Sequence, residues 1–118
     1  MALKLIDHVQ LAMPVGGSDA AKQYYSGVLE IPEVPRPPMQ SVGHWFHDGD
    51  LKVHLGEEED FRPALKAHPA FEVDDLEALK ARLDAAGHEY KVGSEIEGIV
   101  RIFASDPFGN RIEFLQKL

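Results

Sequence analysis

Hydrophobic and polar residues alternate near the start of the chain, which is the pattern of a β-strand with one buried face. Across residues 5–13, Leu5, Val9 and Leu11 point to one side and His8 points to the other. A proline and two glycines follow, and they end the strand. The first element is therefore predicted to be a strand that carries a histidine on its polar face.

A second alternating stretch, residues 41–56, predicts a β-hairpin. The Asp48-Gly49 pair between its two halves is typical of a tight turn. Two registers of this hairpin are plausible, and both place Trp45 on the same side as His54. An aromatic ring and an imidazole are thus expected side by side on the sheet.

Two other stretches have the spacing of amphipathic helices. Residues 18–28 predict a helix of about three turns with Ser18 as its N-cap. Residues 74–86 predict a second helix with a stripe of leucines. It is expected to begin with a capping box formed by Asp74 and Glu77 and to end before a glycine.

The order of elements in the first half of the chain recurs in the second half. A strand at residues 68–73 precedes the second helix, "HEYKVG" follows it, and "IVRIFAS", "DPFGN" and "RIEFLQ" form a hairpin. His68 takes the place of His8, and Glu113 takes the place of His54. A repeat of about fifty residues indicates a duplicated unit. Helices that cover one face of each sheet give an α+β fold.

The polar faces of the predicted sheets carry four residues suited to metal binding. They are His8, His54, His68 and Glu113, all on the side opposite the helices. If the sheets curl, this side lines a concave groove. Imidazoles with a carboxylate suit a divalent ion such as Zn, Ni, Fe, Mn or Co. Taken singly, each histidine is equally well explained as a hydrogen-bonded surface residue, and Glu113 as the partner of Arg111 in an ion pair.

Several further residues are candidates for the substrate site. Trp45 and Tyr25 offer aromatic surfaces, although such rings also serve as packing. Arg101 is a candidate to bind an anionic substrate group, with surface charge as the alternative. His44 and His47 are interpreted as structural or exposed, because His44 shares the side of core-facing residues and His47 lies beside the turn.

Composition narrows the possible classes of protein. The chain has 118 residues and no cysteine, so one domain is expected and disulfides, thiolate zinc sites and cysteine nucleophiles are excluded. The net charge of −8 argues against nucleic acid and anionic membranes as partners. With no leader sequence or apolar span in view, a cytoplasmic protein is expected. A homodimer is also expected, because curled sheets leave edges that need partners.

The segments "IDHVQLAM", "AHPAFEVDDLEALKARLDAAG" and "DPFGNRIEFLQ" resemble the vicinal oxygen chelate superfamily, which includes glyoxalase I, fosfomycin resistance proteins, extradiol dioxygenases and bleomycin resistance proteins. The resemblance implies one domain of two tandem βαβββ modules, at about residues 1–57 and 65–118, with curled mixed sheets around a concave groove. It also implies a metal held by His8, His68 and Glu113, and commonly a homodimer. Where glyoxalase I has a glutamate that serves as ligand and base, this chain has His54.

The leading functional hypothesis is a metal-dependent, glyoxalase-like lyase or isomerase. Its substrate is expected to be a small oxygenated metabolite that binds the metal through two adjacent oxygens. Glu113 or His54 would move the proton, and His54 would otherwise be a fourth ligand. Two alternatives remain open at this point: an Fe(II) extradiol-type dioxygenase, and a non-catalytic binding protein like those that give bleomycin resistance.

Overall fold

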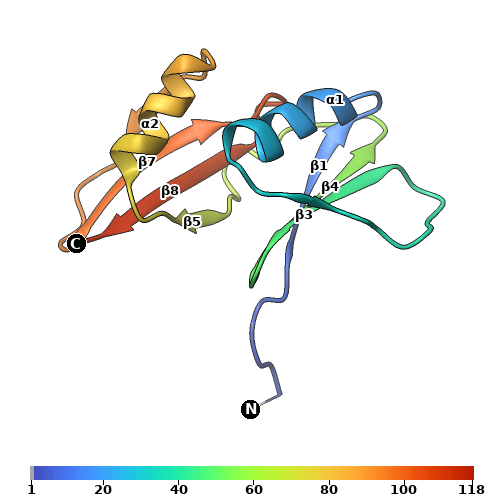
Figure 1. The fold of residues 1–118 in the computed structure, drawn as a ribbon, viewed down its shortest axis with the longest axis horizontal. Coiled ribbons are helices and arrows are strands. Elements are labelled where there is room, and N and C mark those ends of the chain that lie inside the picture. Colours follow the sequence, from blue (N-terminus) through green and yellow to red (C-terminus); the bar gives the residue numbers. More distant parts are fainter. Residues whose placement is uncertain (1) are drawn as a thin grey trace. The chain divides into compact units, whose positions relative to one another are not determined.

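The computed structural model describes residues 2–118 and divides the chain into two compact units, one that extends to Arg62 and one from Pro63 to Leu118. Each unit consists of a strand, a helical segment and three further strands, in that order (Figure 1). No helix in the described part of the chain is long and apolar enough to cross a membrane.

The first unit is a four-stranded mixed sheet with a helical segment on one face. Its elements are β1 (Val9–Pro14), α1 (Ser18–Ala21), the π-helical η1 (Lys22–Val28), β2 (Glu33–Val34), β3 (Gly43–Asp48) and β4 (Leu51–Glu58). The strand order is β1-β4-β3-β2. β1 runs parallel to β4, and β3 and β4 form the predicted hairpin. Its turn is Gly49-Asp50, one residue later than expected, and Gly49 supplies the positive φ of 61°.

The second unit repeats this topology. Its elements are β5 (Ala70–Glu72), α2 (Leu76–Ala85), β6 (Tyr90–Val92), β7 (Ile99–Ser105) and β8 (Arg111–Lys117). The strand order β5-β8-β7-β6 has the same pattern as in the first unit, with β5 parallel to β8. The predicted α+β fold of two tandem βαβββ modules with mixed sheets is therefore confirmed.

In each unit the helical segment covers the apolar face of the sheet (Figure 1). Leu76, Leu79 and Leu83 of α2 are buried, as the leucine stripe predicted. They pack above a sheet whose Ile112 and Phe114 are also buried. Because side chains alternate along a strand, Arg111 and Glu113 lie on the opposite face of β8.

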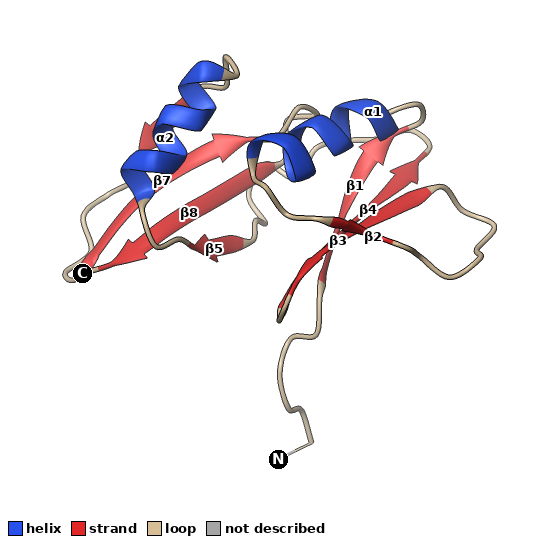
Figure 2. Ribbon diagram, viewed as in Figure 1, coloured by secondary structure: helices blue, strands red, loops and turns tan. Residues whose placement is uncertain are grey.

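Three details differ from the sequence-based expectation. The first strand begins at Val9, and the residues before it form a loop (Figure 2). Val9 pairs with Val53, only two residues after the start of β4, so a strand that began at residue 5 would extend beyond the hairpin and lack a neighbour. Asp75, not Asp74, is the N-cap of α2. Ser18 caps no helix, and its Oγ is hydrogen-bonded to His44 Nε2 at 2.8 Å.

The "DPFGN" turn is tied to the chain that enters the second unit. Asp106 Oδ1 accepts hydrogen bonds from the backbone N–H groups of Phe108 and Asn110. Asn110 Oδ1 accepts from Ala64 N at 3.1 Å, and Ala64 O accepts from Arg111 N at 2.9 Å. This turn therefore joins the beginning of the second unit to the beginning of β8.

Candidate functional site

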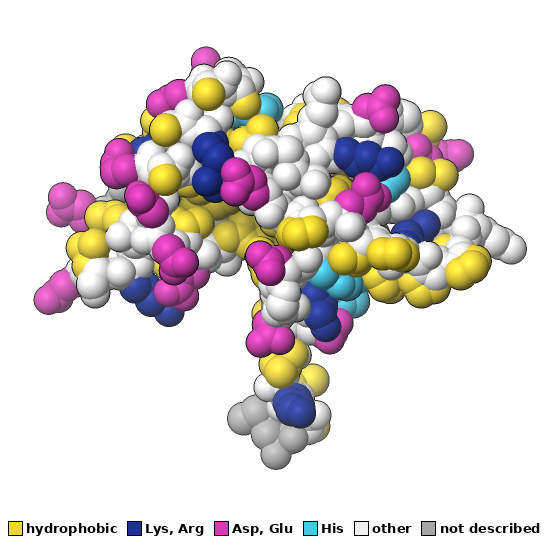
Figure 3. Space-filling view, viewed as in Figure 1, with side chains coloured by type: hydrophobic (Ala, Val, Ile, Leu, Met, Phe, Trp, Pro, Cys, Tyr) yellow, Lys and Arg dark blue, Asp and Glu magenta, His cyan; other side chains and the backbone are white. Residues whose placement is uncertain are grey.

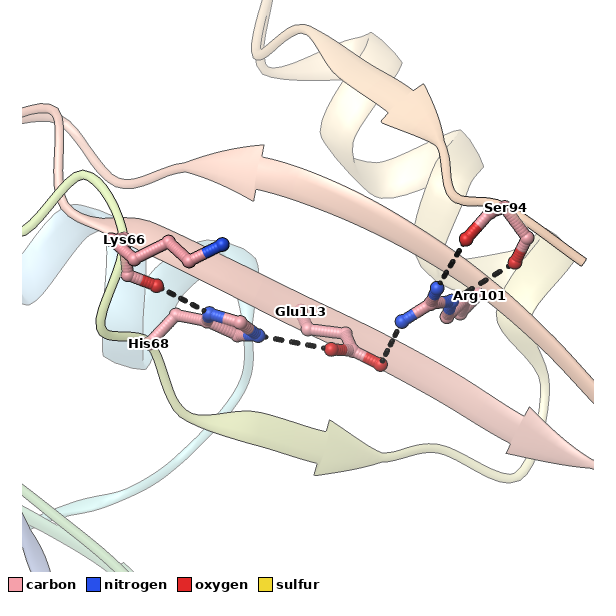
Figure 4. A network of polar contacts seen from close by, with 5 residues as sticks. All are labelled: Lys66, His68, Ser94, Arg101 and Glu113. Carbon is pink, nitrogen blue, oxygen red and sulfur yellow. Dashed lines mark hydrogen bonds and ion pairs between the residues drawn. The ribbon is translucent and has the colours of Figure 1, made fainter. Parts of the chain in front are cut away.

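His68 and Glu113 form a hydrogen-bonded pair in the second unit. The distance between His68 Nε2 and Glu113 Oε1 is 3.0 Å, and Glu113 is 7% exposed. The backbone holds the two residues together, because Glu113 N donates to the carbonyl of Pro69. The sequence-based expectation that His68 and Glu113 share one face of the sheet is confirmed for this pair (Figure 4).

The proton on the His68 ring is located by its other hydrogen bond. Nδ1 lies 2.9 Å from the carbonyl oxygen of Lys66, which only accepts, so Nδ1 carries the hydrogen. In the neutral ring, Nε2 then presents a lone pair to the Glu113 carboxyl group. Two acceptors that face each other repel, so this contact needs a proton or a metal cation between them. A backbone carbonyl on Nδ1 is also the usual way to orient a metal-binding histidine. The donor chemistry of this pair therefore fits a divalent metal.

Arg101 lies on the other side of Glu113. Its Nη1 is 3.5 Å from Glu113 Oε2, while Nε and Nη2 donate to the carbonyl and hydroxyl oxygens of Ser94 at 3.2 and 2.7 Å (Figure 4). These contacts fix the guanidinium and make it a support for Glu113. Arg101 also lines a cavity of about 730 Å³ beside His68, so its predicted role in substrate binding stays a prediction.

In the first unit, His54 is stacked between two other rings. Its ring centre lies 4.3 Å from that of His8 and 4.4 Å from that of Trp45, with an angle of 7° between the planes of His54 and Trp45. Trp45 and His54 are direct cross-strand partners, so the expectation that they share a side is confirmed. His54 is only 6% exposed, whereas His8 remains largely accessible at the edge of the cluster.

His47 belongs to the same cluster, a contact that the sequence analysis did not predict, and its interpretation as structural or exposed stays a prediction. Its Nε2 lies 2.8 Å from Nε2 of His54, and its ring stacks on Trp45 at 5.5 Å. The signal was present in the sequence. His47 is two residues from Trp45 on one strand, so the two side chains must point to the same face. His44 does face the helix side and is hydrogen-bonded to Glu33 and Ser18, in agreement with a structural role.

The environment of His54 keeps its imidazole neutral at neutral pH. Burial, together with the nearby charges of His8 and His47, lowers the pKa of His54 from 6.5 to about 4. The ring of His8 is oriented by Asp7, whose Oδ2 lies 3.0 Å from Nδ1 of His8. That contact leaves Nε2 of His8 as the nitrogen able to bind a metal.

A cavity of about 420 Å³ adjoins this cluster in the first unit. His8, Trp45, His47 and His54 all contribute to its lining, as do the polar residues Gln10, Arg36 and Lys52. Trp45 and the predicted metal ligand His8 thus line the same cavity, on opposite sides of the His54 ring. A flat aromatic surface of this kind supports the predicted substrate-binding role of Trp45, which stays a prediction.

Tyr25 does not fit its predicted role as a substrate-binding residue. It is fully buried at 0% exposure, with its ring packed against Tyr24 and Phe46. The π-helical turns of η1 turn both neighbouring tyrosines toward the core. A side chain enclosed in this way offers no surface to a ligand, so the prediction for Tyr25 was wrong.

The sheet registers show that the candidate residues occupy equivalent places in the two units. Gln10 pairs with His54 on the parallel strands β1 and β4, and Ala70 pairs with Glu113 on β5 and β8. His8 and His68 each lie two residues before those partners. Within residues 2–118, the structure places no group of three or more His, Cys, Asp or Glu side chains that could hold a metal ion. The second unit by itself offers the His68–Glu113 pair, and the predicted four-residue set stays a prediction.

A family model and several known structures resemble this chain. Residues 5–114 match the model of the Glyoxalase/Bleomycin resistance protein/Dioxygenase superfamily. A protein assigned to the glyoxalase family from Bacillus anthracis is 38% identical, with a TM-score of 0.94 over 100% of this chain and 98% of that chain. A variant of the fosfomycin resistance protein FosX from Listeria monocytogenes, complexed with Mn(II) and a dihydroxypropylphosphonic acid, is 15% identical, with a TM-score of 0.82 over 98% of this chain and 94% of that chain. A glyoxylase/bleomycin resistance protein/dioxygenase domain from Frankia is 20% identical, with a TM-score of 0.79 over 99% of this chain and 94% of that chain.

These comparisons differ in what they support. A comparison with curated proteins returned no match. The FosX variant and the Frankia domain share the fold with this chain at low sequence identity. The family model and the Bacillus anthracis structure span nearly all of it. The chain therefore belongs to the glyoxalase/bleomycin resistance protein/dioxygenase superfamily, the vicinal oxygen chelate superfamily that its sequence resembles.

Proposed function

We propose that this protein is a metal-dependent lyase or isomerase of the glyoxalase type. Its substrate is a small oxygenated metabolite that presents two adjacent oxygens to the metal. The observation that carries the proposal is the His68–Glu113 pair, in which Nε2 of the histidine faces the carboxyl group while Nδ1 is held by the Lys66 carbonyl. Membership of the superfamily and the Mn(II) bound to the FosX variant support it.

His8, His68 and Glu113 are the proposed protein ligands. Two imidazoles and one carboxylate suit Fe, Mn, Co, Ni or Zn, so the donor set leaves the identity of the ion open. A divalent ion bound there supplies Lewis-acid stabilisation of negative charge on the substrate oxygens. Asp7 and the Lys66 carbonyl orient the two histidines through their Nδ1 atoms.

His47 and His54 are the proposed proton-transfer pair. His54 is mostly neutral above a pH of about 4, and its Nε2 lies 2.8 Å from Nε2 of His47. In the proposed arrangement, Nε2–H of His47 donates to the unprotonated Nε2 of His54. This arrangement leaves Nδ1 of His47 unprotonated and able to accept a proton from the substrate. The imidazolium that forms is stabilised by the stacked Trp45 ring. His54 is therefore proposed to act through His47 and not as a fourth ligand.

The proposal treats residues 1–118 as one functional domain that acts as a homodimer. The reason is physical: each sheet ends in edge strands, which favour association.

In such a homodimer, the complete ligand set comes either from one chain or from two. Mixing His8→Ala and His68→Ala variants separates these cases. Exchange between chains would restore metal at about a quarter of the sites if two chains share each site, and at none if one chain supplies all ligands.

The direct test is elemental analysis after the chain is incubated with Mn, Zn, Ni, Co or Fe and dialysed. We expect one equivalent of metal in the native chain, and loss of metal in His68→Ala and Glu113→Gln. His88→Ala, which removes an imidazole outside the proposed site, should keep the metal. Proton transfer is then followed by NMR in D2O, as exchange of the C–H hydrogens of dihydroxyacetone.

Other results would overturn the proposal in specific ways. A chain that binds none of these metals would favour the binding-protein alternative. Oxygen consumption with catechol by the Fe(II) form would favour an extradiol-type dioxygenase. Metal binding without any C–H exchange, for dihydroxyacetone or other hydroxycarbonyl probes, would remove the lyase or isomerase assignment.

A further inference from the structure

The cavity beside His68 is basic, although the protein as a whole is acidic. The chain has a net charge of −8, and acidic side chains are scattered over the visible face of the molecule (Figure 3). Four cationic side chains nevertheless line the cavity of about 730 Å³ in the second unit: Lys66, Lys91, Arg101 and Arg111. Glu89 is the one acidic residue in its lining. The cavity therefore has a local excess of positive charge.

Arg111 is held in a fixed position within this cavity. Its guanidinium carbon lies 4.2 Å from the centre of the Phe103 ring, a cation–π contact that orients the planar group. Arg101 and the His68 ring contact the same phenyl ring, at 5.1 and 5.4 Å from its centre. Arg111, Arg101 and His68 are therefore grouped around one phenyl ring, that of Phe103.

Within the described residues Arg111 has no acidic partner, in contrast to five other cations of the chain. Lys22, Lys52, Lys80, Lys117 and Arg101 each lie within 4.0 Å of a carboxylate. Among the residues that the structure describes, none forms an ion pair with Arg111, and the same is true of Lys66. A guanidinium has five donors in a fork that matches two oxygens of one anion. The donors of Arg111 remain available for an anion that enters the cavity.

We infer that the substrate carries, besides its two adjacent oxygens, a separate anionic group that binds to Arg111 on the face of Phe103. The group is a carboxylate or a phosphoryl group, since both offer the paired oxygens that a guanidinium recognises. Lys66 adds a second positive charge at the same cavity. This inference rests on the proposed function, because it assigns the other end of the substrate to the metal ligands His68 and Glu113.

The inference is tested by calorimetric titration with three probes that share one chelating end. Malate, 3-phosphoglycerate and 2-hydroxybutyrate are all 2-hydroxy acids with adjacent oxygens, and they differ in the distal group: carboxylate, phosphoryl or methyl. Each is titrated into the native chain with Mn(II) and without metal. We expect malate, 3-phosphoglycerate or both to bind about tenfold or more tightly than 2-hydroxybutyrate. The tighter of the two identifies the anionic group.

Two variants identify the residue responsible. Arg111→Gln should remove the preference for the charged probes and leave the affinity for 2-hydroxybutyrate unchanged. Arg111→Lys keeps the charge but loses the planar fork, so it should retain only part of the preference. Arg82→Gln, which removes the same charge from α2, should bind all probes like the native chain.

The outcomes separate this inference from the proposed function. Equal affinities for the three probes in a chain that holds Mn(II) would overturn the anion site and leave the metal proposal standing. A preference that survives in Arg111→Gln would also overturn it, because general attraction by the cavity would then be the cause. If the chain holds no Mn(II) but still prefers the charged probes through Arg111, the anion site stands and the metal proposal fails.

Discussion

His54 in the first unit and Glu113 in the second occupy the same place in the repeated fold, yet their surroundings differ. His54 lies between the aromatic rings of His8 and Trp45, and burial holds its imidazole neutral at neutral pH. Glu113 lies between His68 and Arg101, with Oε1 3.0 Å from Nε2 of His68 and Oε2 3.5 Å from Nη1 of Arg101. One position of a duplicated scaffold has therefore acquired a stacked neutral ring, and its counterpart a carboxyl group able to bind a cation. The scaffold fixes where the side chain points, and its neighbours fix the chemistry.

The largest expected effect concerns Glu113. It tests whether this residue binds the metal while His54, at the equivalent position of the first unit, does not. Glu113→Gln should lower metal affinity about 100-fold or more, because a charged ligand is replaced by a neutral one. His54→Gln should change metal affinity less than tenfold. Competition titrations with a chelator measure both. Equal losses in the two variants would make His54 a fourth ligand and abolish the contrast between the two positions.

The next prediction concerns His47, the proposed proton acceptor in the first unit. His47→Ala should lower the rate of C–H exchange by about 10²- to 10³-fold and leave the metal content unchanged, since proton transfer is lost while the ligands remain. His44→Ala, on the same strand but facing the helix, is the matched control and should lose far less. A normal rate in His47→Ala would assign proton transfer to another group.

Protonation of His54 should make the stability of the protein depend on pH. Its pKa is about 4 in the folded chain and 6.5 for an unperturbed histidine, so between these limits the unfolded state binds a proton that the folded state excludes. The free energy of unfolding should therefore fall as the pH decreases from 6.5 to 4, by about 1–3 kcal/mol. Urea denaturation at several pH values measures this fall. His54→Leu should reduce the slope and His88→Leu should not, and equal slopes in all three would contradict the assignment.

The smallest expected effect on stability concerns the N-cap of α2. Asp75 accepts a hydrogen bond from Ala78 N at 3.0 Å, whereas α1 has no side-chain cap. Asp75→Ala should lower the free energy of unfolding by about 1 kcal/mol, and Asp74→Ala should leave it nearly unchanged. Thermal denaturation distinguishes the two. A larger loss in Asp74→Ala would restore the capping box expected from the sequence.

The strands and their faces were predictable because alternation determines both. The same rule put Trp45 beside His54 and Glu113 opposite the apolar residues of β8. Alternation does not determine which polar groups touch, however. His47 was judged by its distance from the turn and not by its side of the strand, and so its contact with His54 was missed.

The burial of Tyr25 and the cap of α2 depend on details finer than the hydrophobic pattern. The helical spacing of Tyr24 and Tyr25 predicts that both face the core, but it does not show whether part of a ring stays open to a ligand. Both rings are enclosed in the structure, with exposed fractions of 1% and 0%. At α2 the two adjacent aspartates have nearly equal cap propensity, and the extended backbone of Asp75 decides between them.

The "DPFGN" turn has a consequence for how relatives of this chain can be compared. Asn110 binds the segment that leads to His68, and the next residue starts the strand that bears Glu113. Gly109 adopts φ of 91°, and a Cβ there would come within 3.3 Å of Pro63. A longer or stiffer loop would therefore shift His68 relative to Glu113 without replacing either residue. If the two are ligands as proposed, the presence of the histidine and the glutamate in a relative is an incomplete criterion for metal binding, and the length of this loop has to be compared as well.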